Sequence, residues 1–461
     1  MLLFTITLGG LLLMMGRHSR AESLFYYFRL EDHVPENHLL RLVDRHVNLE
    51  FIRAKLKDAY SDLGRPSIDP ELLLRILLIG YLYGVTSERK LVEELRMHVA
   101  WRWFTGLGFD QEIPHHSTFS KNRHGRFQES NVFQELFEEI VTRCVEAGLV
   151  KGEHMSVDGS FIQANADHHS RVPREQLAEV AKVNHTVREY LVELERENPV
   201  EAPVAQQEKV STTDPDSTYA TKGGPARLGY YDNYLVDNAS CVIVGVQATP
   251  ARLSQESAAA RDMIERYRER YGYLPQTLAA DTTYGNGELL QWLDDRGIAA
   301  YIRVKENPNG PTDLYGIEQF TYRPEENSYI CPEGKPLKYV GINPLNRTHL
   351  YYSTVKRCRE CSQKSRCTRG KYRTIAIHTC EPARQRARAR TQTPAFAISQ
   401  RARRKVEALF AELKNYIGLR RLRLRRMRFV REQFYLAATA QNLKRLVRFL
   451  SSKPTPQMAT A

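Results

Sequence analysis

The chain has few of the features that mark secreted or membrane-spanning proteins. Seven cysteines among 461 residues are too few for a disulfide-built secreted domain. The apolar run at residues 1–15 lacks a preceding basic segment, and it is shorter than the roughly 20 residues that span a bilayer. Met14 and Met15 stand directly before a Gly-Arg-His-Ser-Arg stretch, so we expect residues 1–22 to be a leader outside the true protein. We therefore expect a cytoplasmic protein.

Acidic residues are also in deficit. Lysine and arginine number 67 against 54 aspartates and glutamates, and the net charge is +13. This excess predicts a polyanionic partner whose phosphates the basic residues contact. It is concentrated in the last quarter of the chain, where the candidate nucleic-acid contacts are Arg403, Arg404, Lys414, Arg420 and Arg421. A membrane surface is disfavoured, because no amphipathic helix in this quarter has a large apolar face.

The stretch Gln400–Lys414 has no proline or glycine and predicts one long helix. At about 100° per residue, its apolar side chains share a stripe that should face a core. Arg403, Glu407 and Lys414 fall on a narrow stripe beside it, whereas Glu412 is expected to point to solvent. Glu407 is therefore the candidate catalytic acid of this helix. The alternative is an exposed Arg403–Glu407 ion pair that contributes a few tenths of a kcal/mol.

Two upstream aspartates favour the catalytic interpretation. Asp158 lies in the middle of a predicted strand at residues 154–164, and Asp281 ends a short strand at residues 277–281. A carboxylate inside a strand usually marks a site or a turn. The predicted order from Asp158 onward is strand, hairpin, helix, strand, helix, strand and, much later, the helix of Glu407. This order resembles an α/β ribonuclease H-like core, a mixed sheet flanked by helices.

In such a core Asp158, Asp281 and Glu407 would converge at one edge of the sheet. Three carboxylates repel one another unless hard cations neutralise them, and their oxygen atoms suit Mg²⁺ or Mn²⁺. Two such ions can activate a water or a 3′-hydroxyl for in-line displacement at phosphorus. The three acids therefore predict the metal-dependent chemistry of nucleases and transposases.

The N-terminal part reads as helical. Asp69 and Pro70 predict a helix start, and Ser87 predicts a second start shortly after Gly84. Ser117 is the expected cap of a further, basic helix. The pattern fits a helix-turn-helix and an ordinary helical bundle equally well. The expected segments are a leader (1–22), a helical DNA-binding domain (23–150), the first part of the core (151–310), an insertion (311–395), the last catalytic helix with basic helices (396–450) and a tail (451–461).

The insertion before the last catalytic helix contains most of the cysteines. Cys358 and Cys361 form a C-x2-C pair, Cys331 opens a Cys-Pro-Glu-Gly turn, and Cys367 follows. Four thiolates with this spacing can bind a structural zinc ion tetrahedrally. Unbound thiols are the alternative, because Cys367 is not part of a second C-x2-C pair and Cys380 could take its place.

Several short motifs resemble those of the DDE transposases of bacterial insertion sequences. They occur in one order from about residue 24 to residue 450: residues 34–38 (VPENH), 64–66 (GRP), 77–89, 117–120 (STFS), 157–160 (VDGS), 211–216 (STTDPD), 280–285 (ADTTYG) and the late helix. The resemblance implies DNA cleavage and strand transfer. It also implies that the N-terminal helices bind the terminal inverted repeats of double-stranded DNA, and that a homodimer acts on the DNA.

The chain departs from the family pattern at two positions. Gln400 occupies the place of a tyrosine that recurs in the family before Arg403, Glu407 and Lys414, and His115 replaces a usual aspartate. Two further functions remain open beside the transposase. A repressor derived from a transposase would bind DNA without cleaving it, and a plain nuclease would cleave DNA without joining strands.

Overall fold

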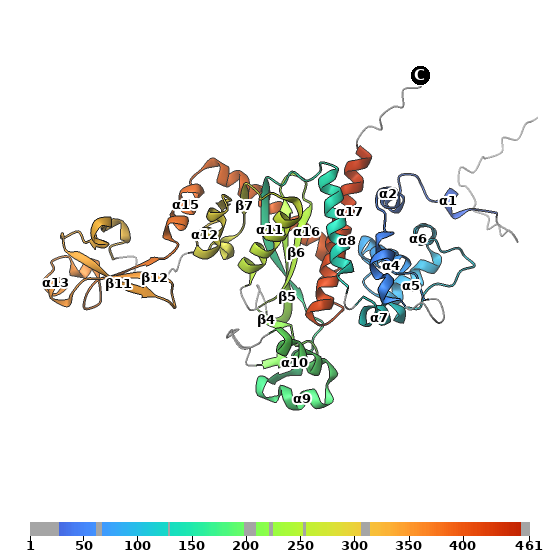
Figure 1. Ribbon diagram of the computed structural model, residues 1–461, viewed down its shortest axis with the longest axis horizontal. Coiled ribbons are helices and arrows are strands. Elements are labelled where there is room, and N and C mark those ends of the chain that lie inside the picture. Colours follow the sequence, from blue (N-terminus) through green and yellow to red (C-terminus); the bar gives the residue numbers. More distant parts are fainter. Residues whose placement is uncertain are drawn as a thin grey trace, which may run out of the picture.

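The computed structural model describes residues 27–60, 67–127, 130–197, 209–220, 225–251, 255–305 and 314–452. The predicted leader, the Gly64-Arg65-Pro66 motif and most of the predicted tail lie outside these residues. Three parts follow one another along the longest axis of the molecule (Figure 1). N-terminal helices lie at one end, a mixed sheet lies in the middle, and the insertion projects at the other end.

The central sheet contains antiparallel and parallel strands, so the predicted mixed α/β class is confirmed. Its path is β4-β5-β1-β7-β8, and β6 pairs with the other edge of β5. β1 is antiparallel to β5 and parallel to β7, and β7 is parallel to β8. The strands are β1 (His154–Gln163), β4 (Thr218–Ala220), β5 (Arg227–Asp237), β6 (Ile243–Pro250), β7 (Thr277–Ala279) and β8 (Ala299–Tyr301).

Helices cover both faces of this sheet. α11 (Glu256–Tyr271) packs Met263 against Gly245 of β6, and α12 (Gly287–Asp295) connects β7 to β8. On the opposite face α16 (Pro394–Asn415) stacks Phe410 on Tyr234 of β5, with ring centroids 4.7 Å apart. The predicted long helix at Gln400–Lys414 is confirmed, and its apolar stripe is buried as expected.

The N-terminal helices begin largely where their capping residues predict. Asp69 accepts a hydrogen bond from the Glu71 amide at the start of α4, and Ser87 accepts one from the Lys90 amide at the start of α5. Ser117 is not the cap of its helix but the first helical residue, after His116. The helices are α1 (Leu30–His33), α2 (Leu39–His46), α3 (Phe51–Leu56), α4 (Pro70–Tyr83), α5 (Glu88–Met97), α6 (Val99–Thr105), α7 (Ser117–His124) and α8 (Val132–Glu146).

The last helix, α17 (Met427–Ser452), joins the N-terminal helices to the sheet. It packs against α2, α4, α8 and β6 and is buried around most of its circumference. Arg123 of α7 forms a buried ion pair with Glu432 of α17, with Nε and Oε1 2.6 Å apart. This end of the chain is therefore interior structure rather than a basic surface helix.

Residues 171–197 do not form one continuous helix. The segment contains strand β2 (Arg171–Pro173) and two helices, α9 (Leu177–Val183) and α10 (His185–Glu197). β2 pairs with β3 (Lys209–Ser211). Leu177, Val187 and Val210 form a small apolar core of their own, which a single exposed helix could not build.

The insertion is a five-stranded antiparallel sheet with two short helices. The strand order is β13-β12-β11-β10-β9, and α15 (Glu381–Thr391) then leads back to α16. The elements are β9 (Thr321–Arg323), β10 (Ser328–Ile330), β11 (Pro336–Asn343), β12 (Thr348–Tyr352), α13 (Val355–Arg359), α14 (Lys364–Cys367) and β13 (Thr374–His378). In the described part of the chain, no helix is both long and apolar enough to cross a membrane.

Candidate active site

Asp158 and Asp281 lie side by side at one end of the sheet. The parallel register of β1 and β7 pairs Ser156 with Ala279, and both aspartates lie two residues beyond that pair. Because side chains alternate between faces along a strand, an offset of two places both acids on the same face. Neighbouring strands are about 4.8 Å apart, so the backbones that carry the two aspartates run close together here.

The environment of Tyr284 gives independent evidence for this gathering of acids. Burial raises the pKa of Tyr284, and the negative charges of Asp158, Glu256 and Asp281 raise it further. Its hydroxyl is buried and has no hydrogen-bond partner among the described residues. Glu256, the first residue of α11, is thus a further carboxylate near the two aspartates. No spacing in the sequence pointed to it.

Arg403 connects Glu407 of α16 to Asp158 of β1. Arg403 donates from Nη1 to Oδ2 of Asp158 over 2.9 Å and from Nη2 to Oε1 of Glu407 over 3.3 Å. The Asp158 side chain is 17% exposed and that of Glu407 is 59% exposed. The guanidinium therefore bridges an acid of the sheet and an acid of α16, and it neutralises charge that would otherwise accumulate.

The three predicted acids fit a divalent cation by type but not by present arrangement. Carboxylate oxygens are the donors that Mg²⁺ and Mn²⁺ prefer. Among the residues that the structure describes, however, no group of three or more acids, histidines or cysteines is arranged to hold a metal ion. The Arg403 guanidinium lies between Asp158 and Glu407, where a shared cation would need both carboxylates.

Gln400 of α16 forms three side-chain hydrogen bonds at this site. Its side-chain amide donates to the carbonyl oxygen of Ala280 over 3.2 Å and to that of Tyr301 over 2.7 Å. Its side-chain oxygen accepts from Arg403 Nε over 3.3 Å. One glutamine thus joins α16 to the ends of β7 and β8 and orients the arginine that contacts two of the acids. The sequence identified this position only as a departure from the family pattern.

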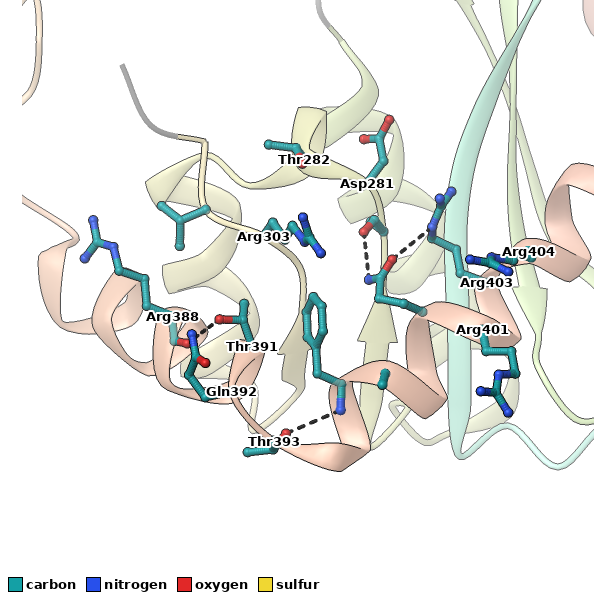
Figure 2. Close-up of a pocket in the computed structure, with 15 residues that line it drawn as sticks. Asp281, Thr282, Arg303, Arg388, Thr391, Gln392, Thr393, Arg401, Arg403 and Arg404 are labelled. Atoms are coloured by element: carbon teal, nitrogen blue, oxygen red, sulfur yellow. Dashed lines mark hydrogen bonds between the residues drawn. The ribbon is translucent and has the colours of Figure 1, made fainter. Parts of the chain in front are cut away.

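A positively charged cavity of about 960 Å³ opens beside Asp281. Figure 2 shows Arg303 and Arg403 near Asp281, with Arg388 on the far side of the cavity beside Gln392. The five arginines of its lining are Arg303, Arg388, Arg401, Arg403 and Arg404. Phe396 adds an aromatic wall. An acidic edge beside a basic cavity suits a phosphate-bearing ligand, because the arginines attract the charge that the carboxylates repel.

The other predicted DNA contacts lie outside this cavity. Lys414 is half-buried. Burial raises the pKa of Asp232 well above its ordinary value, and the positive charge of Lys414 opposes that rise, although neither Asp232 oxygen has a hydrogen-bond partner in the described chain. Arg420 is exposed and donates to Asn415 Oδ1. Arg421 is exposed and forms an isolated β-bridge with Gln163.

The expectation that Glu412 points to solvent is wrong. Its Oε2 lies 2.8 Å from Arg445 Nη2 and accepts from Gln441 Nε2 over 3.3 Å, and its side chain is only 20% exposed. Both partners belong to α17. The helical pattern predicts one buried face for α16, whereas α17 covers a second side of it.

The four insertion cysteines act on one another electrostatically but, in the described structure, are not arranged as a metal site. Burial raises the pKa of the Cys367 thiol, and the nearby Cys358, Cys331 and Cys361 raise it further against the lowering effect of Arg373. The Lys335 amide donates to Cys331 Sγ over 3.4 Å, as expected for a tight Cys-Pro-Glu-Gly turn. All seven cysteines are unpaired. Cys380 precedes α15 and is not among the groups that act on Cys367.

Two family models match the chain. A transposase domain (DUF772) matches residues 28–125, and a transposase DDE domain matches residues 330–447. The chain carries two transposase domains. The resemblance to DDE-type transposases is thereby confirmed, and the two matches suggest a role in transposition. The second match includes Glu407 and the four insertion cysteines, but it includes neither Asp158 nor Asp281.

A cryo-EM structure of a piggyBac transposase synaptic complex with hairpin DNA is a distant structural neighbour. The alignment covers 91% of this chain and 82% of that chain, with 9% sequence identity and a TM-score of 0.31. No curated protein matches the chain. A likeness of this size carries no argument about the fold or the site.

Proposed function

We propose that the chain is a transposase that binds the terminal inverted repeats of its own insertion sequence and catalyses DNA cleavage and strand transfer. The observation that carries the proposal is the arrangement at one end of the sheet. Asp158 and Asp281 lie side by side there, Glu407 shares Arg403 with Asp158, and an arginine-lined cavity opens next to them. Arginines that grip phosphates beside catalytic acids are what in-line phosphoryl transfer requires.

The strand order supports a ribonuclease H-like core. Three antiparallel strands, β6, β5 and β1, continue into the parallel pair β7 and β8, and helices connect the later strands. The end of β7 lies beside the first half of β1, because Ala279 pairs with Ser156, two residues before Asp158. Asp158, Asp281 and Glu407 are the proposed catalytic residues and the proposed ligands of Mg²⁺ or Mn²⁺. Arg403, Arg404, Arg420 and Arg421 are proposed DNA contacts, together with Lys414.

Single substitutions of the three acids test the catalytic assignment. Asp158→Asn, Asp281→Asn and Glu407→Gln should each abolish cleavage of DNA that carries the element's ends, while binding of that DNA persists. Glu269→Gln, at an exposed position of α11, is the matched control and should leave cleavage unchanged. Cleavage that survives in all three variants at wild-type rate would refute the assignment.

The same assay separates the alternative functions. A repressor derived from a transposase would bind the end DNA without cleaving it at any concentration of Mg²⁺ or Mn²⁺. A nuclease would cleave the ends without joining them to a second duplex. Analysis of the DNA products from wild-type protein therefore decides between the three functions before any variant is made.

Arg403 and Gln400 are proposed to position the site. Arg403→Ala should slow cleavage strongly. It should also lower the salt slope, which is the steepness with which the logarithm of the binding constant for end DNA falls with the logarithm of salt concentration, by about one unit, because one phosphate contact is lost. Gln400→Ala should slow cleavage by on the order of a hundredfold, since displacements near 1 Å have that effect, but should leave the salt slope unchanged. Gln400→Glu retains an oxygen for Arg403 and loses the amide donor to Tyr301, so it isolates the contribution of that donor.

Lys414 gives the sharpest test of the basic stripe on α16. As a DNA contact it would lower the salt slope by about one unit when changed to alanine. As a partner of buried Asp232 it would instead lower stability and leave the slope unchanged. A salt series and a denaturant titration on Lys414→Ala distinguish these two roles.

We further propose that Cys331, Cys358, Cys361 and Cys367 bind one structural zinc ion. The small core of the insertion, against which Cys331 and Cys367 pack, supports this. Among the described residues, Phe320, Leu337, Tyr351 and Ile375 are its buried members, and so few apolar side chains rarely stabilise a module without a metal or disulfide. The described thiols are not arranged as a metal site, so zinc binding would have to draw them together.

A further inference from the structure

A short part of the insertion is strongly basic. Residues 354–373 contain eight lysines and arginines and one glutamate, a net charge of +7 within twenty residues, whereas the whole chain has +13. They span α13, α14 and the turn that leads into β13. These residues belong to the projecting insertion, away from the acidic end of the central sheet.

These cations divide into structural and surface groups. Arg357 donates to the carbonyl oxygen of Pro336, and Arg373 donates to those of Cys367 and Tyr315. By contrast, the exposed cations Lys356, Arg359, Arg366 and Lys371 form no ion pair with any carboxylate that the structure describes. We call these four residues the insertion cations.

In the neighbouring basic helix α15, by contrast, the arginines pair with carboxylates of the protein itself. Arg384 and Arg388 pair with Glu381, and Arg386 and Arg390 pair with Asp294. Each of these four arginines therefore has a carboxylate within its own part of the fold. The insertion cations lack this compensation, and exposed like charges repel one another at low ionic strength. An external polyanion would remove the repulsion.

The position of the insertion decides which polyanion fits. It lies at one end of the longest axis, the N-terminal helices lie at the other end, and the sheet with the candidate acids lies between them (Figure 1). A long, regular polyanion that contacts the N-terminal helices and passes the acids can continue to the insertion. Double-stranded DNA has this form, with one phosphate charge per about 1.7 Å of helix axis.

We propose that the insertion cations are a second duplex-binding surface, which contacts the phosphate backbone without reading sequence. The inference deepens the proposed function, on which it rests for the identity of the DNA. Lysines and arginines without base-reading partners position a duplex rather than specify it. Lys356 and Arg359 belong to α13, Arg366 to α14 and Lys371 to the turn before β13, so one module presents all four cations.

The test compares two doubly charge-reversed variants of the full-length chain. Lys356→Glu with Lys371→Glu alters the insertion, and Lys151→Glu with Lys209→Glu is the control. All four lysines are exposed, and none has an ion-pair partner among the described residues. The probe is a random-sequence DNA duplex, bound across a salt series. The insertion variant should lower the salt slope by about two units, because two phosphate contacts are lost, and the control should not.

Two results would overturn the inference. One is an equal salt slope in both variants, which would show that only the total charge matters. The other is a changed oligomeric mass with an unchanged slope, which would assign the surface to an acidic protein partner such as a second copy of the chain. Circular dichroism of both variants confirms that each is folded.

The outcome is separable from that of the proposed function. If wild-type protein cleaves end DNA and the slope of the insertion variant equals that of the control, only the second surface is refuted. If the slope falls but wild-type protein never cleaves, the surface stands and the catalytic proposal fails.

Discussion

The N-terminal helices and the insertion are attached to the central sheet in opposite ways. Apolar residues from α2 to α17 form one continuous core that includes the sheet, whereas the insertion has a separate core of four buried side chains. The N-terminal helices therefore cannot be removed without exposing the interior of the sheet. The insertion contributes little to that interior and depends on its own contacts. A destabilising substitution in the N-terminal helices should therefore lower the stability of the whole molecule, whereas one in the insertion should unfold the insertion alone.

The buried ion pair between α7 and α17 gives the largest expected effect. Arg123 and Glu432 are 4% and 3% exposed, and Glu88 contacts the same guanidinium. Changing Arg123 to methionine leaves Glu432 buried without its partner, which costs roughly 3–5 kcal/mol. Denaturant unfolding should show this loss in the main transition. The matched control is Lys182→Met, which removes an exposed pair with Glu179 and should cost less than about 1 kcal/mol.

A loss for Arg123→Met no larger than that for Lys182→Met would contradict a shared core. It would mean that the N-terminal helices unfold independently of α17. The double variant Arg123→Met with Glu432→Leu sharpens the result, because replacing both charges with apolar groups should recover much of the loss.

The second prediction concerns the buried carboxyl of Asp214, which contacts the residue that precedes α17. Asp214 Oδ1 accepts from Tyr230 Oη over 2.8 Å and from the Arg426 amide over 2.9 Å, and its Oδ2 is buried without a partner in the described chain. Burial raises the pKa of Asp214 from 3.8 to about 7. The folded state therefore holds the proton more tightly than the unfolded state. This stabilisation is complete below pH 3.8 and is lost as the pH rises to about 7.

Asp214→Asn should remove this pH dependence. Between those pH values, the unfolding free energy of the wild type should fall relative to that of the variant by at most about 1.4 kcal/mol per pH unit. The difference between the two proteins is the quantity to measure, because half-buried histidines such as His98, whose pKa is lowered by desolvation, act in the opposite direction. Parallel pH profiles would contradict a protonated Asp214.

The sequence predicted the parts of the molecule that depend on local pattern. Asp69 and Ser87 accept their capping hydrogen bonds as expected, and β1, β5 and β6 lie where alternation and turn residues placed them. The proximity of Asp158 and Asp281 follows from strand order alone, so it too was accessible from the sequence.

The errors arose where distant segments decide the outcome. Glu412 was expected in solvent because a helical wheel gives α16 a single buried face, while Arg445 of α17 covers another. The segment at residues 171–198 folds around Val210, a residue more than twenty positions away from α9. Arg303 and Arg388 line the cavity only because β8 and α15 meet α16, and no spacing in the sequence brings those two arginines together.

The insertion gives the smallest expected effect on the main unfolding transition and completes the comparison. Changing Cys358 and Cys361 together to serine should abolish binding of about one zinc ion per chain, measured by metal analysis of protein purified without chelator. Because the core of the insertion is separate, the main transition should shift by less than about 0.5 kcal/mol. Cys380→Ser is the control and should retain zinc. Protein without zinc in the wild type would refute the metal site. A large loss of global stability on removing the two thiols would instead show that the insertion belongs to the main core. Unfolding of the insertion can destabilise the central sheet only through contacts between the insertion and the sheet.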